Sequence, residues 1–192
     1  MSRYIRPKLP GACVFFTVNL VDRGADTLVR HVDVLRQAVA VTRAKRPFAI
    51  DAWVVLPDHM HCLWTLPEGD SDYSIRMSSI KAQFTAGLRR SGFRPTPLQR
   101  NEYGANGGRV RVGSAGRVGL KPDLRGDERP EVRRGNEASV WQKRFWEHHI
   151  RGDADYAAHV RYCWINPVKH GLVGHPREWP FSSWHRDAGG AV

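Results

Sequence analysis

Several features that would place the chain in a membrane or outside the cell are missing from its sequence. None of its apolar runs approaches the roughly 20 residues that a helix needs to cross a bilayer. The first residues, MSRYIRPKLPGA, are basic but lack the apolar core of a signal peptide. We therefore expect a cytoplasmic protein with no membrane partner.

Cysteine is also scarce, with three residues in a chain of 192. Cys13, Cys62 and Cys163 lie far apart, each inside an apolar segment. An odd number without CxxC spacing argues against a disulfide framework and against a zinc site built on cysteine. We expect buried, reduced thiols.

Acidic residues are few compared with basic ones. The 30 Lys and Arg outnumber the 19 Asp and Glu, which gives a formal charge of +11 and a pI near 10.2. Such a surplus favours a polyanionic partner, with nucleic acid ahead of an anionic membrane surface. Charge alone is equally compatible with a basic protein that binds neither.

The length suits one domain with a real core. Apolar periodicity predicts strands at 12–20, 48–56, 59–66 and 140–150, and helices at 30–45, 72–90 and 153–166. Pro167 is predicted to end the last helix, and an irregular packed tail to follow it. The order β-α-β-β-α-β-α predicts an α+β fold: a ferredoxin-like antiparallel sheet with helices on one face.

One segment, at about 92–138, interrupts this order. It is rich in Gly and Arg and has little apolar periodicity, apart from a stretch, GRVRVGSAGRVG, that could form a short hairpin. A loop of this length without its own structure is unusual inside a compact domain. We therefore expect residues 1–192 to form a single domain that carries a flexible basic insertion.

The sharpest local feature is His59-Met60-His61 in the third predicted strand. Alternate residues of a strand point to the same side, so both imidazoles would project together and could bind one divalent ion. Two ligands do not complete a reactive metal site. The alternative is a pair of polar histidines on a solvated sheet face.

The last predicted helix offers complementary groups. Tyr162 and Asn166 are four residues apart and share one helix face, so a phenol nucleophile and an amide ligand would lie side by side. His159 is a rival ligand on nearly the same face, whereas Tyr156 points away from it. The alternative for Tyr162 is a core tyrosine whose hydroxyl is hydrogen-bonded.

Basic and aromatic residues alternate in two further segments, a pattern typical of contacts with phosphates and unpaired bases. The candidate DNA-binding residues are Arg3, Tyr4, Arg6, Lys8, Trp141, Lys143, Arg144, Trp146 and Lys169. Each segment could equally be a strand packed on one face, or a solvated terminus.

Several blocks taken together resemble the REP-associated tyrosine transposases, a branch of the single-tyrosine HUH transposase superfamily. These blocks are FFTVNLVDR, DAWVVLPDHMHCLWTLPEGD, IKAQF, WQKRFWEHHIR, DYAAHVRYCWINPVKHGLV and WPFSSWHRD. The resemblance covers about residues 1–90 and 139–187. The basic insertion has no clear counterpart in the family plan, and a longer C-terminal extension of some relatives is missing.

The resemblance implies a metal-dependent endonuclease and strand transferase, acting on single-stranded hairpin DNA through a 5′-phosphotyrosine. It places the nucleophile at Tyr162 and the ligands of Mg²⁺ or Mn²⁺ at His59, His61 and Asn166. It further implies a bacterial, nucleoid-associated protein that works as a monomer, with a dimer as the alternative. Two other functions stay open: a catalytically inactive binder of hairpin DNA or RNA, and a hydrolase that uses water in place of tyrosine.

Overall fold

The computed structural model describes residues 8–93 and 139–187. The predicted insertion, apart from its first two residues, and the candidate DNA-binding residues Arg3, Tyr4 and Arg6 lie outside these ranges.

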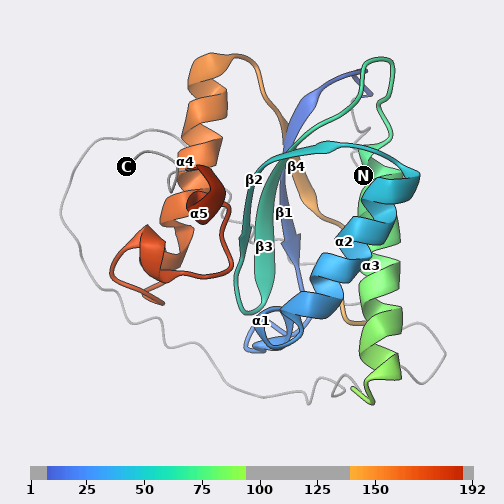
Figure 1. Cartoon of the computed structure of the whole chain (residues 1–192), viewed down its shortest axis with the longest axis vertical. Helices are drawn as coiled ribbons and strands as arrows, with labels where there is room; N and C mark the ends of the chain where they lie inside the picture. The colour runs from blue at the N-terminus through green and yellow to red at the C-terminus, as the bar shows by residue number, and fades with distance from the viewer. Residues whose placement is uncertain (1–7, 94–138, 188–192) are drawn as a thin grey trace, which may run out of the picture.

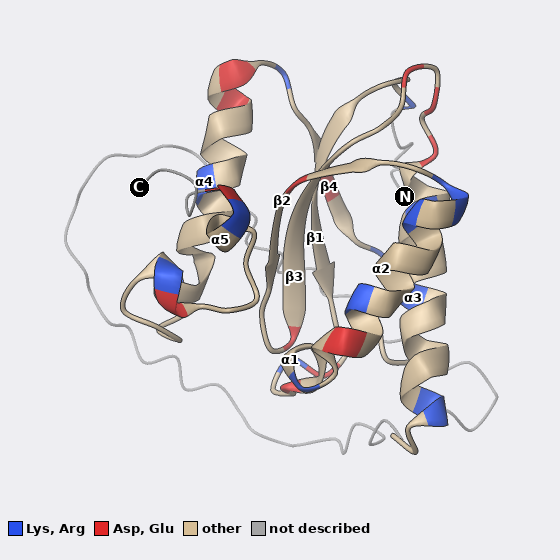
Figure 2. Cartoon of the chain, viewed as in Figure 1, with Lys and Arg blue, Asp and Glu red and all other residues tan. Residues whose placement is uncertain are grey.

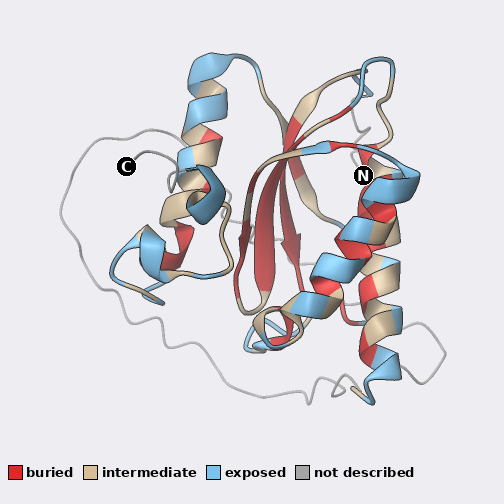
Figure 3. Ribbon diagram, viewed as in Figure 1, coloured by how far each residue is buried: buried red, intermediate tan, exposed pale blue. Residues whose placement is uncertain are grey.

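A four-stranded antiparallel sheet forms the centre of the molecule (Figure 1), which confirms the predicted α+β class. Its strands are β1 (Cys13–Asn19), β2 (Ala49–Val55), β3 (His59–Thr65) and β4 (Trp146–His149). They lie in the order β2-β3-β1-β4, so the two central strands are β1 and β3. Nearly every residue of these two strands is buried, as expected for strands that are covered on both faces (Figure 3).

One face of the sheet packs against α2 (Val32–Lys45) and α3 (Tyr73–Arg90), which follow the short helix α1 (Thr27–Arg30). Met60, Cys62 and Trp64 of β3 point to this side and join the main core cluster. Their even-numbered spacing is the period of two that a strand imposes on its side chains.

The opposite face is covered by α4 (Asp153–Lys169), so the prediction that all helices lie on one face is wrong. Phe15, Leu63 and Cys163 are fully buried in a second core cluster between the sheet and α4. The physical reason is that β1 and β3 are apolar on both sides, so a single helical layer would leave one apolar face in water. The α4 side is also the face toward which His59 and His61 project.

Two predicted boundaries differ from the structure. The strand predicted at 140–150 is regular only over β4, and Trp141 contributes one isolated bridge to Leu20. Helix α4 continues past Pro167 to Lys169, because a proline near the end of a helix removes one amide donor while the amide of His170 still bonds Asn166 at 3.0 Å.

The predicted irregular tail contains a 3₁₀ turn at Pro176–Glu178 and a short helix, α5 (Trp184–Asp187). It lies along the outer edge of β2, where Arg186 donates to the carbonyls of Ile50 and Asp51 at 2.9 and 2.6 Å. This edge strand is thereby protected from pairing with another chain.

The three cysteines are free thiols, with Cys62 and Cys163 buried and Cys13 half-buried.

Charged residues lie mainly on the outer surfaces of the helices and in the connections, leaving the sheet almost uncharged (Figure 2).

Candidate active site

The two histidines of the HMH motif lie at the start of β3 and project from the same face of the sheet. Their ring centroids are 5.0 Å apart and their planes are nearly perpendicular, at 85°. Both side chains are buried, with 5% of His59 and 3% of His61 exposed. Because the polar nitrogens of both rings are buried, each needs a hydrogen-bond partner or a shared metal ion.

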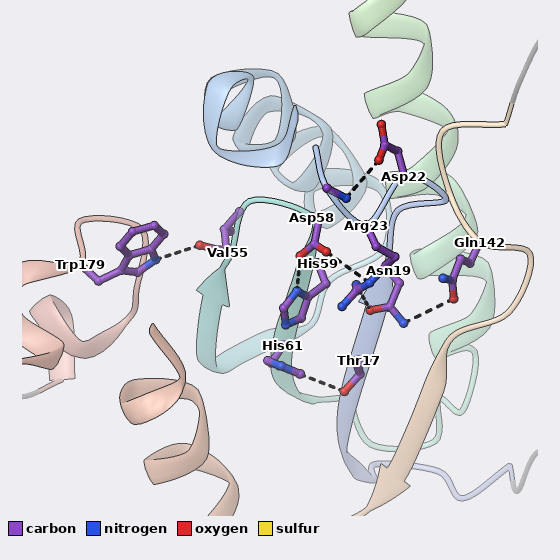
Figure 4. A network of polar contacts seen from close by, with 11 residues as sticks. Thr17, Asn19, Asp22, Arg23, Val55, Asp58, His59, His61, Gln142 and Trp179 are labelled. Carbon is purple, nitrogen blue, oxygen red and sulfur yellow. Dashed lines mark hydrogen bonds and ion pairs between the residues drawn. The ribbon is translucent and has the colours of Figure 1, made fainter. Parts of the chain in front are cut away.

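Each imidazole has one ring nitrogen already occupied by a neighbour (Figure 4). The Nδ1 atom of His59 lies 2.6 Å from Asp58 Oδ1, and the Nδ1 atom of His61 lies 2.9 Å from Thr17 Oγ1. A carboxylate can only accept, so His59 Nδ1 donates in this bond and Nε2 is the ring nitrogen left for another partner. Metal-binding histidines usually have such a partner on the second nitrogen, which fixes the tautomer and the ring orientation.

The protonation state of His61 also suits a metal ligand. Burial lowers the pKa of His61 well below its ordinary value, and the neighbouring His59 and His170 act in the same direction because a proton on either ring would repel one on His61. The neutral imidazole is the form that binds a metal ion.

The carboxyl group that holds His59 is kept ionised by its own neighbours. Although burial alone would raise the pKa of Asp58, its hydrogen bond to His59 and the charge of Arg23 bring the net pKa below the ordinary value. Arg23 Nε lies 3.2 Å from Asp58 Oδ2, and Arg23 Nη1 donates to Asn19 Oδ1 at 2.6 Å. Figure 4 shows these residues linked in one polar network around the histidine pair.

Helix α4 brings the predicted tyrosine to the histidine pair. The ring centroids of Tyr162 and His61 are 5.1 Å apart and the rings meet edge to face. The ring of Phe15 packs against both of these rings, with its centroid 5.8 Å from that of Tyr162 and 5.7 Å from that of His61. This packing fixes the distance between Tyr162 and His61. The phenol is therefore held beside the metal-ligand candidates by packing.

Asn166 lies one helical turn beyond Tyr162, and its side chain is buried, with 1% exposed. Its Oδ1 atom has no hydrogen-bond partner within the described residues. A buried amide oxygen without a partner is costly, and a bound cation would satisfy it. This orphaned oxygen, together with the two imidazoles, fits the ligand set of a divalent ion such as Mg²⁺ or Mn²⁺.

Burial raises the pKa of the Tyr162 phenol, and the adjacent Asn166 amide only partly offsets this. The phenol is thus protonated at neutral pH and has to lose its proton when it attacks. Lys169 Nζ lies 4.7 Å from the centre of the Tyr162 ring, so Tyr162, Asn166 and Lys169 form one stripe of α4.

A second group of metal-ligand types lies nearby and includes the predicted rival ligand His159. His148, Asp155 and His159 place one ligand atom each within 4.8 Å of one another and could hold an ion. Asp155 is already engaged with both rings: its carboxylate lies 2.8 Å from His148 Nε2, and its backbone carbonyl lies 2.9 Å from His159 Nδ1. The two rings are stacked, 4.8 Å apart at 17°, so their in-plane lone pairs do not converge well. The geometry suits a clamp between β4 and the start of α4 better than a metal site.

Among the candidate DNA-binding residues within the described ranges, Trp141 and Lys143 line one cavity together with Lys81 and Arg89. Trp141, predicted to stack on bases, is 5% exposed and its Nε1 donates to Lys81 O at 3.2 Å, so it belongs to the core. Trp146 is half-buried against His148. Exposed basic side chains remain at Lys8, Lys143, Arg144 and Lys169.

Asp58 and Thr17 were not among the predicted site residues. Asp58 directly precedes His59, and a carboxylate beside a histidine pair is a signal that could have pointed to it. Thr17 gave no such signal, since only the pairing of β1 with β3 places it opposite His61.

Comparison with known proteins gives close relatives. The chain is 41% identical over 187 residues, 97% of its length and 85% of the relative's, to the REP-associated tyrosine transposase of Escherichia coli strain K12. It is 36% identical to a putative REP-associated tyrosine transposase of Haemophilus influenzae, over 97% of this chain and 88% of the relative. No family model matches the chain.

A solved structure of a REP-associated tyrosine transposase bound to a REP hairpin is similar in fold as well as in sequence. The TM-score is 0.71 at 39% identity, covering 98% of this chain and 86% of the solved one.

These relatives and the solved structure show that the chain is an enzyme of the HUH tyrosine transposase class, and the histidine pair with a tyrosine helix packed over it is consistent with that class. Membership of this class points to the use of a divalent metal ion. With this identity over nearly its whole length, the chain belongs to the family of REP-associated tyrosine transposases. None of the helices in the described ranges has the length and apolar character that spanning a bilayer requires.

Proposed function

We propose that the chain cuts and rejoins single-stranded DNA at REP-type hairpins, with Tyr162 as the nucleophile and His59, His61 and Asn166 as the metal ligands. The observation that carries this proposal is the packing of the Tyr162 ring against His61, 5.1 Å between centroids, on the sheet face that holds both histidines. No other tyrosine in the described residues lies beside the histidine pair in this way.

The proposed ion is Mg²⁺ or Mn²⁺. When bound, it would supply positive charge to the scissile phosphate and to the departing oxygen. Support comes from the depressed pKa of His61, from the carboxylate and hydroxyl that orient the two imidazoles, and from the orphaned oxygen of Asn166. A mixed set of nitrogen and oxygen ligands tolerates either ion.

In the proposed reaction the phenol oxygen of Tyr162 attacks phosphorus in line with the leaving 3′-oxygen. A bond between the phenol oxygen and phosphorus forms, the bond between phosphorus and the 3′-oxygen breaks, and the products are a 5′-phosphotyrosine and a 3′-hydroxyl. The phenolic proton leaves to solvent and the 3′-oxygen takes up a proton. Since the phosphodiester energy is kept in the phosphotyrosine, a 3′-hydroxyl can reverse the step and join strands.

Contacts to the DNA backbone are proposed for Lys8, Lys143, Arg144 and Lys169, whose side chains are exposed, and base stacking for Trp146. Arg3, Tyr4 and Arg6 are proposed to contact phosphates as well. We further propose that residues 1–192 act as one domain and as a monomer, on the DNA of a bacterial nucleoid.

The test is covalent capture of the DNA. Protein is incubated with Mn²⁺ and a single-stranded hairpin oligonucleotide taken from inverted repeats beside the gene, and the adduct is separated on a denaturing gel. Wild type and Tyr156→Phe should form the adduct, because the Tyr156 side chain is exposed and lies off the site. Tyr162→Phe should form none; an adduct of normal yield in this variant would contradict the assignment.

A further inference from the structure

A small cavity opens at the end of the sheet, next to His59. It has a volume of about 230 Å³ and lies between the segment after β1, the β2–β3 turn and the segment after α4. Its lining combines a polar rim, the Arg23 guanidinium and the His170 imidazole, with an apolar wall that includes Pro57 and Leu172. Leu172 is 39% exposed, so its apolar surface is accessible at the mouth of this cavity.

A chain of ring contacts leads from Tyr162 through the histidine pair to this cavity. The ring centroids of Tyr162 and His61 are 5.1 Å apart, and those of His61 and His59 are 5.0 Å apart. The ring of His170, on the cavity rim, lies a further 5.0 Å from His59. The nucleophile is therefore at one end of the histidine pair and the cavity is at the other.

We propose that this cavity binds the nucleotide on the 5′ side of the scissile phosphate, the one whose 3′-oxygen leaves. This inference rests on the proposed function, because it takes Tyr162 as the nucleophile. In-line displacement puts the attacking and leaving oxygens on opposite sides of phosphorus. With the phenol at the His61 end, the leaving oxygen and its nucleotide point toward His59 and the cavity.

The chemistry of the lining fits a nucleotide. Asp58 and Asn19 hold the guanidinium of Arg23 in place. It can therefore bind the phosphate on the 5′ side of this nucleotide without a change in its side-chain conformation. Leu172 and Pro57 provide an apolar surface against which the face of one base can lie. The space is large enough to hold a single nucleobase, as an unpaired nucleotide of a single-stranded substrate requires.

Binding this nucleotide has a consequence for strand transfer. After the P–O3′ bond breaks and the phenol oxygen holds the phosphoryl group, the cavity would retain the nucleotide that carries the new 3′-hydroxyl. The hydroxyl then stays aligned with the phosphotyrosine, and the reverse step remains fast until this strand is exchanged.

The test combines substrate and protein changes. Once wild type has mapped the cleavage position, three oligonucleotides are compared: the intact hairpin, one with an abasic site immediately 5′ of the scissile phosphate, and one with an abasic site immediately 3′ of it. Initial rates of adduct formation are measured at subsaturating DNA for wild type, Leu172→Ala and the control Leu9→Ala. Leu9 is also an exposed leucine, 53% exposed, but it lies near the opposite end of the sheet, before β1.

In wild type and Leu9→Ala we expect the 5′ abasic site to slow adduct formation about tenfold, and more than the 3′ abasic site does. In Leu172→Ala the intact hairpin should be slow, and the 5′ abasic site should add little further loss, because the lost base and the lost side chain share one contact.

Two results would overturn the inference while leaving the proposed function intact: equal 5′ abasic penalties in wild type and Leu172→Ala, or a larger penalty on the 3′ side. Absence of any adduct from the intact hairpin with wild type would instead contradict the proposed function itself, and the inference with it.

Discussion

At the scale of single residues, the site is built from groups that are only partly satisfied within the protein. The Asn166 oxygen is buried without a partner, and the His59 and His61 rings each use one nitrogen for orientation. Such arrangements lower the stability of the metal-free fold and are retained where a ligand completes them. Two expectations follow from the individual contacts.

Replacing the unsatisfied amide should separate stability from metal binding. Asn166→Leu removes a buried oxygen that has no hydrogen-bond partner. The metal-free variant should therefore unfold at the same temperature as wild type or higher, with a free energy of unfolding larger by up to about 1 kcal/mol. The rise in unfolding temperature that Mn²⁺ gives to wild type should disappear. Thermal unfolding with and without Mn²⁺ measures both, and a full Mn²⁺ shift in the variant would remove Asn166 from the ligand set.

The hydroxyl that contacts His61 should matter through metal affinity. Thr17→Val keeps the side-chain shape but removes the partner at 2.9 Å, so the Mn²⁺ concentration needed for half-maximal adduct should rise about 10- to 100-fold. Excess Mn²⁺ should restore the rate. Thr65→Val is the matched control, because Thr65 bonds Asp51 at the other end of the sheet. Equal Mn²⁺ requirements in the two variants would show that Thr17 does not orient the ligand.

At the scale of elements, most helices and strands follow from local pattern, but their layers do not. The 3.6-residue apolar repeats predicted α2 and α3, and continuous apolar runs rich in β-branched and aromatic residues predicted β1 and β3. The sequence of α4 likewise predicts a helix, but its local pattern does not determine which face of the sheet the helix covers. Its position on the histidine face depends on Phe15, Leu63 and Cys163 packing together, which are contacts distant in the sequence.

The close approach of α2 and α3 gives an element-scale test. A Cβ added at Gly87 would overlap a methyl group of Val34. Alanine favours a helix over glycine by about 1 kcal/mol, but overpacking of this contact should win and destabilise Gly87→Ala by about 1–3 kcal/mol. Urea unfolding measures the change.

Adding Val34→Ala to Gly87→Ala should recover much of the lost stability, since it makes room for the new methyl group. Adduct formation below the unfolding temperature should be unaffected, because this packing lies on the sheet face away from Tyr162. A single variant more stable than wild type would show that the two helices can separate without cost.

At the scale of the whole molecule, the formal charge of +11 makes DNA affinity depend on salt. Each phosphate contact should contribute about 0.7 to 0.9 to the slope of log affinity against log salt. If Lys143 and Arg144 contact phosphates, replacing both with alanine should make the slope shallower by about 1.4 to 1.8. Fluorescence anisotropy of a labelled hairpin across a KCl series measures this.

The matched control replaces Arg30 and Arg36 with alanine, which removes the same charge from the surface. These arginines pair with Asp26 and Asp33, so their loss should change the slope little. Equal changes in the two double variants would mean that Lys143 and Arg144 act through net charge alone.

Several features of this protein follow from its sequence alone. The common direction of His59 and His61 and the shared helix face of Tyr162 and Asn166 rest on covalent geometry, which acts over a few residues. The net positive charge follows from composition. The blocks that resemble the transposase family were likewise readable without coordinates.

Only the tertiary structure decided which groups meet. It placed α4 over the histidine face, brought Thr17 to His61 through strand pairing, buried Trp141 in the core, and formed the cavity from three separate segments. The physical reason is that these contacts join residues far apart along the chain, where packing of apolar faces rather than local periodicity determines the outcome.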